Sequence, residues 1–236
     1  MTHEVKVHEA QTKILRELLF LPGVSFSRLV EVTGLDGDHA KFHIKRLVEV
    51  GYLKKRHGEY SLTVKGKEYA NKLDTDTNTI ERQPKSTCIF ILRDRKAGKF
   101  LIQERLKNPY FGFWAFYSGK IRWGERIAET AVRETLEETA LVTKVEDWEH
   151  RGVYHEIVKN SQTGEIIEDK IFHLMYCEKF SGELMENYEG GRNFWAEYDE
   201  VRKYPKHFKS LEVEAEAAEG NIGFVERVDE YEEGEF

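Results

Sequence analysis

Three glutamates in the middle of the chain, Glu134, Glu137 and Glu138, have the spacing needed to share one side of a helix. At about 100° per residue they fall within roughly a third of the helix circumference. No Gly or Pro interrupts residues 126–139, so a helix is permitted throughout. Like charges at this spacing destabilise a bare helix by about 0.2–0.5 kcal/mol per pair. A hard divalent cation, which takes carboxylate and phosphate oxygens, would offset this cost; the simpler interpretation is a solvated acidic face.

The wider segment resembles the Nudix box, in which a Gly, five residues, a Glu and seven residues lead into Arg-Glu-apolar-any-Glu-Glu-any-Gly-apolar. Residues 119–141 read GKIRWGERIAETAVRETLEETAL and keep every charged position of that box. Two positions depart from it. Thr135 replaces an aliphatic residue, which should weaken packing, and Ala140 replaces a Gly that would accept a left-handed helix end more readily. The matching positions are Gly119, Glu125, Arg133, Glu134, Glu137, Glu138 and Leu141.

The resemblance implies that water hydrolyses the phosphoanhydride of a nucleoside diphosphate linked to another group. The barrier to this reaction is largely electrostatic, and divalent cations lower it by neutralising phosphate charge and acidifying the attacking water. Mg²⁺ or Mn²⁺ is therefore the implied cofactor. Its implied ligands are Glu134, Glu137, Glu138 and the carbonyl oxygen of Gly119.

Further residues match catalytic positions of the family. Arg133 and Glu125 stand where an arginine and a glutamate usually pair and orient the helix. The general base of the family is either the glutamate equivalent to Glu134 or one in a later loop. Glu189, in the segment ENYEGGRNFW, is the candidate for the second case, as base or as an extra metal ligand. An ordinary loop carboxylate is the alternative interpretation of Glu189.

Substrate contacts are predicted for basic residues near the box. Arg105, at the end of a predicted strand, and Lys120, in the box loop, would contact phosphates, although a solvated role is equally consistent for Lys120. The identity of the nucleotide is not readable. ADP-sugar hydrolases carry a proline downstream of the box, and none lies between Pro109 and Pro205, which counts against that subclass.

The elements around the box predict a mixed α/β domain. Strands on both sides of one central helix resemble the α/β/α sandwich of Nudix domains. A later helix is expected at 207–220, and the acidic run at 226–236 is expected to be a solvated tail. The expected strands cover residues 88–92, 100–103, 153–158, 171–180 and 192–201.

The N-terminal part of the chain predicts a small helical domain with one hairpin. Pro22-Gly23 ends a first helix, and Ser25 can cap a second. Asp36 or Asp38 can cap a third helix, and a hairpin that turns at His57-Gly58 precedes a last one. This order of elements resembles a winged helix-turn-helix domain.

That second resemblance implies contacts with duplex DNA, with the third helix in a major groove and the hairpin near phosphates. Between residues 41 and 56, six lysines or arginines accompany a single acid, Glu49. Such basic surfaces bind DNA by releasing counterions. The alternative left open is a winged helix used for protein contacts or dimerisation. The predicted DNA contacts are His39, Lys41, Phe42, Lys45, Arg46, Lys54, Lys55 and Arg56.

Charge divides the chain into the same two parts. Residues 1–73 hold 13 lysines and arginines against 9 acids, whereas the remainder holds 23 against 34. Opposite signs suggest two domains with different partners. The expected organisation is a winged helix-turn-helix domain at 1–73, a polar linker at 74–85 and a Nudix domain with an acidic tail at 86–236.

Composition favours a globular cytoplasmic protein. The 236 residues are 40% hydrophobic and 33% charged, and neither a signal peptide nor an apolar run of membrane-spanning length is expected. Cys88 and Cys177 stand in strand-like apolar runs and are predicted to be buried thiols. A homodimer is expected, since winged helices that read DNA are often dimeric.

Two functions follow from these patterns. The first is a Mg²⁺-dependent pyrophosphohydrolase acting on a nucleotide derivative, with DNA-binding regulation through the N-terminal domain. The second is a transcriptional regulator whose Nudix domain senses a nucleotide metabolite. Bacterial repressors of NAD metabolism join the same two domain types, but there the winged helix follows the Nudix domain. The intact box carboxylates favour the first function.

Overall fold

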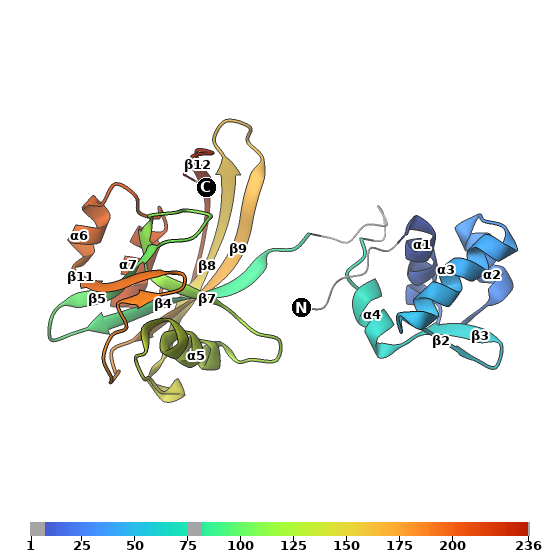
Figure 1. Ribbon diagram of the computed structural model, residues 1–236, viewed down its shortest axis with the longest axis horizontal. Coiled ribbons are helices and arrows are strands. Elements are labelled where there is room, and N and C mark those ends of the chain that lie inside the picture. Colours follow the sequence, from blue (N-terminus) through green and yellow to red (C-terminus); the bar gives the residue numbers. More distant parts are fainter. Residues whose placement is uncertain (1–7, 75–81, 236) are drawn as a thin grey trace. The chain divides into compact units, whose positions relative to one another are not determined.

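A computed structural model describes residues 8–74 and 82–235 of the chain, which divides into two compact units, Met1–Arg82 and Gln83–Phe236 (Figure 1). Most of the linker predicted at 74–85 lies outside the described residues. Lys85, its last residue, already begins a strand. Within the described parts, no helix is both long and apolar enough to cross a membrane.

The described part of the first unit contains four helices and a three-stranded sheet in the order β1-β3-β2. Its apolar residues form one core, which includes Ile14, Leu29 and Leu47. The elements are α1 (Glu9–Phe20), β1 (Val24–Ser25), α2 (Phe26–Thr33), α3 (Gly37–Glu49), β2 (Leu53–Arg56), β3 (Glu59–Leu62) and α4 (Val64–Ala70).

Local hydrogen bonds explain where these helices begin and end. The Ser25 hydroxyl accepts from the Arg28 backbone N–H, and Gly34 closes α2 in the left-handed conformation, with φ 69°. The Asp36 carboxylate accepts from two backbone N–H groups at the start of α3. The helices and the hairpin predicted from the sequence are therefore confirmed, and Asp36 rather than Asp38 is the cap of α3.

A nine-stranded sheet forms the centre of the second unit, in the order β10-β11-β5-β4-β9-β8-β12, with β6 paired to β5 and β7 paired to β4. The strands are β4 (Lys85–Asp94), β5 (Lys99–Arg105), β6 (Trp114–Ala115), β7 (Tyr117–Lys120), β8 (Glu149–Asn160), β9 (Ile166–Cys177), β10 (Asn187–Tyr188), β11 (Gly191–Ala196) and β12 (Phe224–Tyr231). The helices are α5 (Ile127–Thr139), α6 (Tyr198–Lys203) and α7 (Leu211–Glu219).

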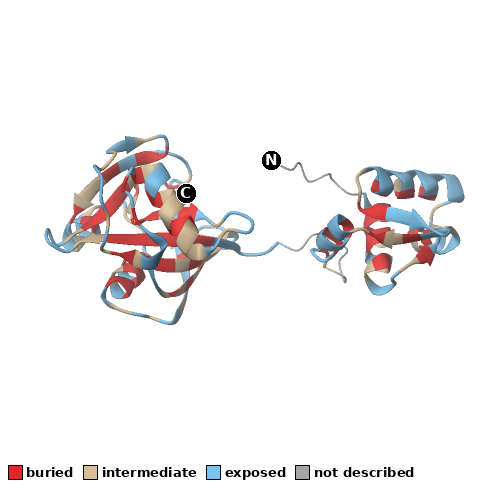
Figure 2. Ribbon diagram, turned by 90° about the horizontal axis from the view of Figure 1, so that it is seen from below, coloured by how far each residue is buried: buried red, intermediate tan, exposed pale blue. Residues whose placement is uncertain are grey.

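Helices cover both faces of this sheet, so side chains of β4 alternate between two cores. Phe90 packs on the side of α5, with Ala131. Ile89 and Ile91 pack on the side of α7, with Ala217. Buried residues accordingly follow the strands and the inner sides of the helices (Figure 2). The fold is mixed α/β, as predicted, and both cysteines are buried thiols without a disulfide.

Two predictions for the C-terminal region are wrong. Residues 198–201, expected to continue a strand, lie in α6, whose acidic first turn and basic last turn complement the helix dipole. Residues 224–231 are not a solvated tail but form β12, which runs parallel to β8 at the edge of the sheet (Figure 1). Backbone pairing and burial of Tyr231, which is 2% exposed, offset the low hydrophobicity of this segment.

Candidate active site

Close packing of α5 against β7 defines one wall of the site. A Cβ atom added to Gly119 would lie 2.3 Å from Cγ of Glu134, which is closer than two such atoms can approach. Only glycine allows this contact, and it brings Glu134 beside the end of β7. The Gly119 carbonyl oxygen accepts a hydrogen bond of 2.6 Å from the Thr87 hydroxyl on β4.

Arg133 connects the acidic residues of the box. Its guanidinium donates to both oxygens of Glu125, at 2.6 and 2.8 Å, and to Glu134 at 2.7 Å. Hydrogen bonds from Arg133 lower the pKa of Glu125 to about 2. The predicted pairing of Arg133 with Glu125 is therefore present, and it anchors the loop before α5 to the middle of the helix.

Glu134 and Glu138, one turn apart on α5, both line a cavity of about 510 Å³. The amide of Gln103 on β5 donates to Glu138 at 2.9 Å, and the Tyr188 hydroxyl donates to Gln103 at 3.0 Å. Burial raises the pKa of Glu138, and the negative charge of Glu134 adds to this rise. Arg133 offsets part of the charge of Glu134, whereas Gln103 offers Glu138 a neutral amide, so a cation between the two carboxylates would be stabilising.

Glu137 has a different environment from its two neighbours. It is exposed, receives hydrogen bonds from Arg122 and Arg133, and is not part of the cavity wall. Among residues 8–74 and 82–235, no three His, Cys, Asp or Glu side chains are grouped to hold a metal ion. The oxygen donors of Glu134 and Glu138 nevertheless suit a hard divalent cation. Glu137 lies on the same helix, and Gly119 lies on β7, in contact with Glu134.

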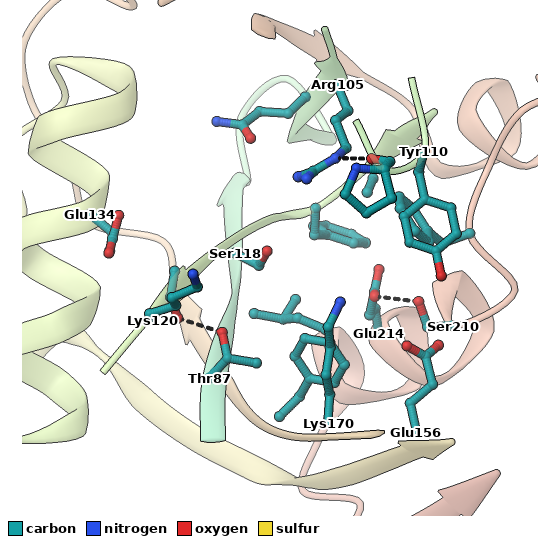
Figure 3. Close-up of a pocket in the computed structure, with 18 of the residues that line it drawn as sticks. Thr87, Arg105, Tyr110, Ser118, Lys120, Glu134, Glu156, Lys170, Ser210 and Glu214 are labelled. Atoms are coloured by element: carbon teal, nitrogen blue, oxygen red, sulfur yellow. Dashed lines mark hydrogen bonds between the residues drawn. The ribbon is translucent and has the colours of Figure 1, made fainter. Parts of the chain in front are cut away.

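The cavity opens where β5 and β7 diverge. β4 pairs with β7 through Thr87–Phe90 but with β5 only through Arg93–Asp94, so the two strands leave a gap above the sheet. Figure 3 shows Lys120 beside Glu134, and Arg105 further along the cavity, beside Tyr110. The Arg105 guanidinium is held by the carbonyl oxygen of Pro109 at 2.5 Å. The basic residues that line the cavity are Lys85, Arg105, Lys107, Lys120 and Lys170.

Comparison with known proteins identifies the second unit. A family model described as the NUDIX domain matches residues 82–216, more than half of the chain. The chain belongs to the Nudix family.

Relatives of known name match the same region. An ADP-ribose pyrophosphatase of Methanocaldococcus jannaschii is 32% identical over 99 residues, which cover 40% of this chain and 56% of that protein. An uncharacterized Nudix hydrolase of Bacillus subtilis is 23% identical over 100 residues, which cover 42% of this chain and 61% of that protein. The chain thus spans about three fifths of the length of these relatives.

A solved structure shares the fold of the Nudix unit. The crystal structure of a MutT protein from Bacillus halodurans aligns with a TM-score of 0.52 and 21% sequence identity. The alignment covers 64% of this chain and 93% of that chain. The likeness concerns the fold alone.

The two departures from the Nudix box have different structural outcomes. Thr135 is fully buried, and its hydroxyl donates to the Ala131 carbonyl oxygen at 2.6 Å and lies 2.8 Å from the Tyr117 hydroxyl. These hydrogen bonds satisfy the buried hydroxyl, and the weaker packing expected from loss of the aliphatic side chain stays a prediction. Ala140 does adopt the left-handed conformation, with φ 59°. Leu136, also on α5, is 52% exposed.

Glu189 is not part of the cavity wall, although its neighbour Tyr188 is. It stands in the turn between β10 and β11, is exposed, and is not among the residues that line the cavity. This position gives no support to a role as general base. Sequence reasoning also missed the second end of the cavity, formed by Glu156, Lys170 and Glu214. The available signal was Glu156, which occupies an inward position of β8 between Tyr154 and Val158.

The predicted DNA contacts all lie at the surface of the first unit. His39, Lys45 and Arg46 are exposed on α3, with Lys45 3.8 Å and Arg46 3.6 Å from carboxylate oxygens of Glu49. Phe42, on the same helix, is 66% exposed. The remaining predicted contacts are also exposed, namely Lys41 on α3 and Lys54, Lys55 and Arg56 on β2.

Proposed function

We propose that the Nudix unit is a Mg²⁺- or Mn²⁺-dependent pyrophosphohydrolase that cleaves a nucleoside diphosphate linked to another group. The observation that carries the proposal is the shared cavity wall of Glu134 and Glu138, opposite basic side chains such as Arg105 and Lys120. A bound divalent cation would neutralise phosphate charge and acidify water. Glu134 and Glu138 would hold it, with Glu137 and the Gly119 carbonyl oxygen as further ligands.

Other residues near the two carboxylates position them, balance their charge and bind the diphosphate. Arg133 fixes the orientation of Glu134 and neutralises Glu125, which keeps the loop at Gly119 and α5 in one arrangement. Arg105 and Lys120 would bind the non-bridging oxygens of the diphosphate. Glu134 would accept the proton of the attacking water as general base, since Glu189 lies outside the cavity wall.

ADP-ribose is the first substrate to test, because the relative from Methanocaldococcus jannaschii carries it in its name. The missing proline between Pro109 and Pro205 counts against ADP-sugars, so the panel should include other nucleoside diphosphate derivatives and nucleoside triphosphates. Turnover with Mg²⁺ and with Mn²⁺ is the measurement. Release of a nucleoside monophosphate from any of these compounds would support the proposal.

Glu138→Gln provides the decisive variant, with Glu146→Gln as its control. Glu138 lines the cavity, whereas Glu146 is exposed and outside it. We expect Glu138→Gln to lose at least about 100-fold in turnover with its fold intact, because one carboxylate charge toward the cation is removed. Glu146→Gln should match the wild type. Equal turnover in all three proteins would refute the assignment.

We further propose that the first unit is a winged helix-turn-helix domain that binds duplex DNA through α3 and the β2–β3 hairpin. The exposed side chains of Lys41, Lys45, Arg46, Lys54 and Arg56 support this role. Affinity for DNA of the adjacent genomic region should fall steeply with salt, and Lys45→Glu or Arg46→Glu should weaken it for all sequences. Absence of binding at low salt would contradict it.

A regulator that senses a nucleotide metabolite is the second candidate function. It would use the same cavity for binding and the same first unit for DNA. The discriminating measurement is DNA affinity with and without a non-hydrolysable nucleotide. A change in affinity without any turnover would favour the regulator, and turnover without a change in affinity would favour the enzyme.

A further inference from the structure

The end of the cavity away from α5 contains a buried carboxyl group with an unused oxygen. Glu214 on α7 is 2% exposed. Its Oε1 atom accepts a hydrogen bond of 2.8 Å from the Ser210 hydroxyl. Its Oε2 atom is buried and has no hydrogen-bond partner in the described part of the chain. Figure 3 shows the Glu214 side chain pointing into the cavity, beside Ser210 and across from Glu156. An unpaired buried oxygen is destabilising, so a ligand group that bonds to it would be stabilising.

The surroundings of Glu214 are rich in other acids. Glu156 faces it from β8, and Asp229 on β12 lies near Glu156, since the Tyr154 hydroxyl bonds to both. Glu168 accepts from Tyr110 at 3.1 Å and from Lys170 at 2.6 Å, so the ammonium group of Lys170 is already paired.

Burial and the charge of Glu156 raise the pKa of Glu214 to about 8. At neutral pH this side chain is therefore a carboxylic acid, which offers one O–H donor and one C=O acceptor.

The two ends of the cavity are separated by the width of a nucleotide. Gly119 lies on β7 and Glu156 on β8, with β4 and β9 between them. Three strand spacings of about 4.8 Å give roughly 14 Å across the sheet. The cavity wall between the ends includes the apolar side chains of Ile89, Phe116 and Phe172. A diphosphate at the basic end would thus place a planar ring over these side chains, near Glu214.

We propose that Glu214 binds the nucleobase of the substrate, and that it selects bases with an amino group next to an acceptor ring nitrogen, as in adenine and cytosine. This assignment rests on the proposed function, because the diphosphate is taken to lie at the end formed by Glu134 and Glu138. The Glu214 O–H donates to the ring nitrogen, and its C=O accepts from the amino group. The second amino hydrogen then points toward the oxygens of Glu156.

Glu214 would hold the exocyclic group of the base against Glu156, and this contact supplies the discrimination between bases. Hypoxanthine and uracil have a carbonyl oxygen where adenine and cytosine have an amino group. Burial raises the pKa of Glu156 to about 7, below that of Glu214, so between about pH 7 and pH 8 Glu156 is the carboxylate and Glu214 the acid. In that range the carbonyl oxygen would face the carboxylate oxygens of Glu156 without a shared hydrogen, which is repulsive in a buried site. Sites that hydrogen-bond a substrate N–H strongly reject the analogue that lacks it.

Binding of nucleoside 5′-monophosphates to the full chain, without metal, tests the proposal independently of hydrolysis. The matched pairs are AMP against IMP and CMP against UMP, each differing in one amino group. We expect AMP and CMP to bind at least about 10-fold more tightly than IMP and UMP by calorimetry. Equal binding within each pair, tighter binding of IMP or UMP, or no binding of any of the four would overturn the proposal.

Variants of Glu214 separate recognition from packing. Glu214→Gln keeps one donor and one acceptor, so the preference for AMP over IMP should persist within about threefold. Glu214→Leu removes both groups and should abolish the preference for AMP over IMP. If that variant does not fold, Ser210→Ala provides the second test. It removes the hydrogen bond that orients Glu214 and should reduce the preference. An unchanged preference in a folded Glu214→Leu would overturn the proposal. Discrimination between AMP and IMP without turnover of any diphosphate would refute the hydrolase function alone.

Discussion

Gly119 and Glu134 are in direct contact, and a Cβ atom at position 119 would stand 2.3 Å from Cγ of Glu134. The contact sets the distance between β7 and α5. It also explains why a box that needs a carboxylate at 134 needs a glycine fifteen positions earlier. The glycine is required for space, because its φ is not in the left-handed range.

Gly119→Ala should therefore displace Glu134 rather than strain the backbone. We expect about 1–3 kcal/mol of destabilisation from overpacking. Turnover should fall about 100-fold, because a displaced carboxylate cannot hold its productive position. Gly220→Ala is the control, since a Cβ atom there meets nothing within 4 Å and the backbone is extended. Wild-type turnover in Gly119→Ala would show that Glu134 does not have to occupy its observed place.

Arg133→Gln should destabilise the Nudix unit by about 3 kcal/mol at neutral pH, because it leaves the largely buried Glu125 and Glu134 without their cation. Glu125 has a pKa of about 2 in the folded state, below its ordinary 4.5. Its stabilising contribution is thus complete above about pH 4.5 and is lost as pH falls through 2. The difference between variant and wild type should shrink accordingly in acid.

Tryptophan fluorescence during denaturant unfolding measures the stability of the Nudix unit. All four tryptophans, Trp114, Trp123, Trp148 and Trp195, lie in the second unit. Arg126→Gln is the control, because Arg126 and Glu129 form an exposed pair whose loss should leave stability near that of the wild type. A difference between Arg133→Gln and wild type that stays constant from pH 7 to pH 3 would contradict the assigned role of Glu125.

Ala140→Gly should stabilise the Nudix unit. Ala140 ends α5 in the left-handed conformation, with φ 59°, which costs a residue with a Cβ atom about 1–2 kcal/mol. Glycine avoids that cost but loses more backbone entropy on folding, so the net gain should be about 0.5–1 kcal/mol. Ala128→Gly, inside α5, should change stability in the opposite direction. A loss of stability in Ala140→Gly would show that this helix end is not strained.

Glu214→Gln should make stability less dependent on pH. The folded-state pKa of Glu214 is raised from 4.5 to about 8 by burial and by Glu156, so the folded protein loses stability as pH rises from about 4.5 to 8. The glutamine variant has no such loss and should gain on the order of 3 kcal/mol over wild type between pH 5 and pH 8. Glu216→Gln, exposed on the same helix, should follow the wild type. Parallel curves for Glu214→Gln and wild type would contradict a protonated Glu214.

Much of the fold and of the cavity wall formed by Glu134 and Glu138 follows from local sequence patterns. The resemblance to the Nudix box predicted the pairing of Arg133 with Glu125, which the structure contains, whereas the hydrogen bond from Arg133 to Glu134 was not predicted. Caps such as Ser25 and Asp36 likewise marked helix ends, since their hydrogen bonds are made within three residues.

The features that sequence reasoning missed depend on contacts between distant segments. β12 is a strand because β8, about 70 residues earlier, pairs with it in register, and its acidic composition does not reveal this. Glu214 and Glu156 lie close together only because α7 packs over β8. The local sequence around either residue therefore gave no indication that the two share a cavity. Glu137, in contrast, has the expected position on α5, but it forms an ion pair with Arg122. Helical periodicity alone does not predict this ion pair.

Metal binding tests the central claim most directly. Mn²⁺ uptake by the full chain at neutral pH and low salt can be followed by electron paramagnetic resonance, with and without α,β-methylene ADP-ribose, a non-hydrolysable analogue. We predict that the wild type binds Mn²⁺ and that the double variant Glu134→Gln/Glu138→Gln binds it at least about 10-fold more weakly. No uptake by the wild type under either condition, or equal uptake by the double variant, would contradict the account.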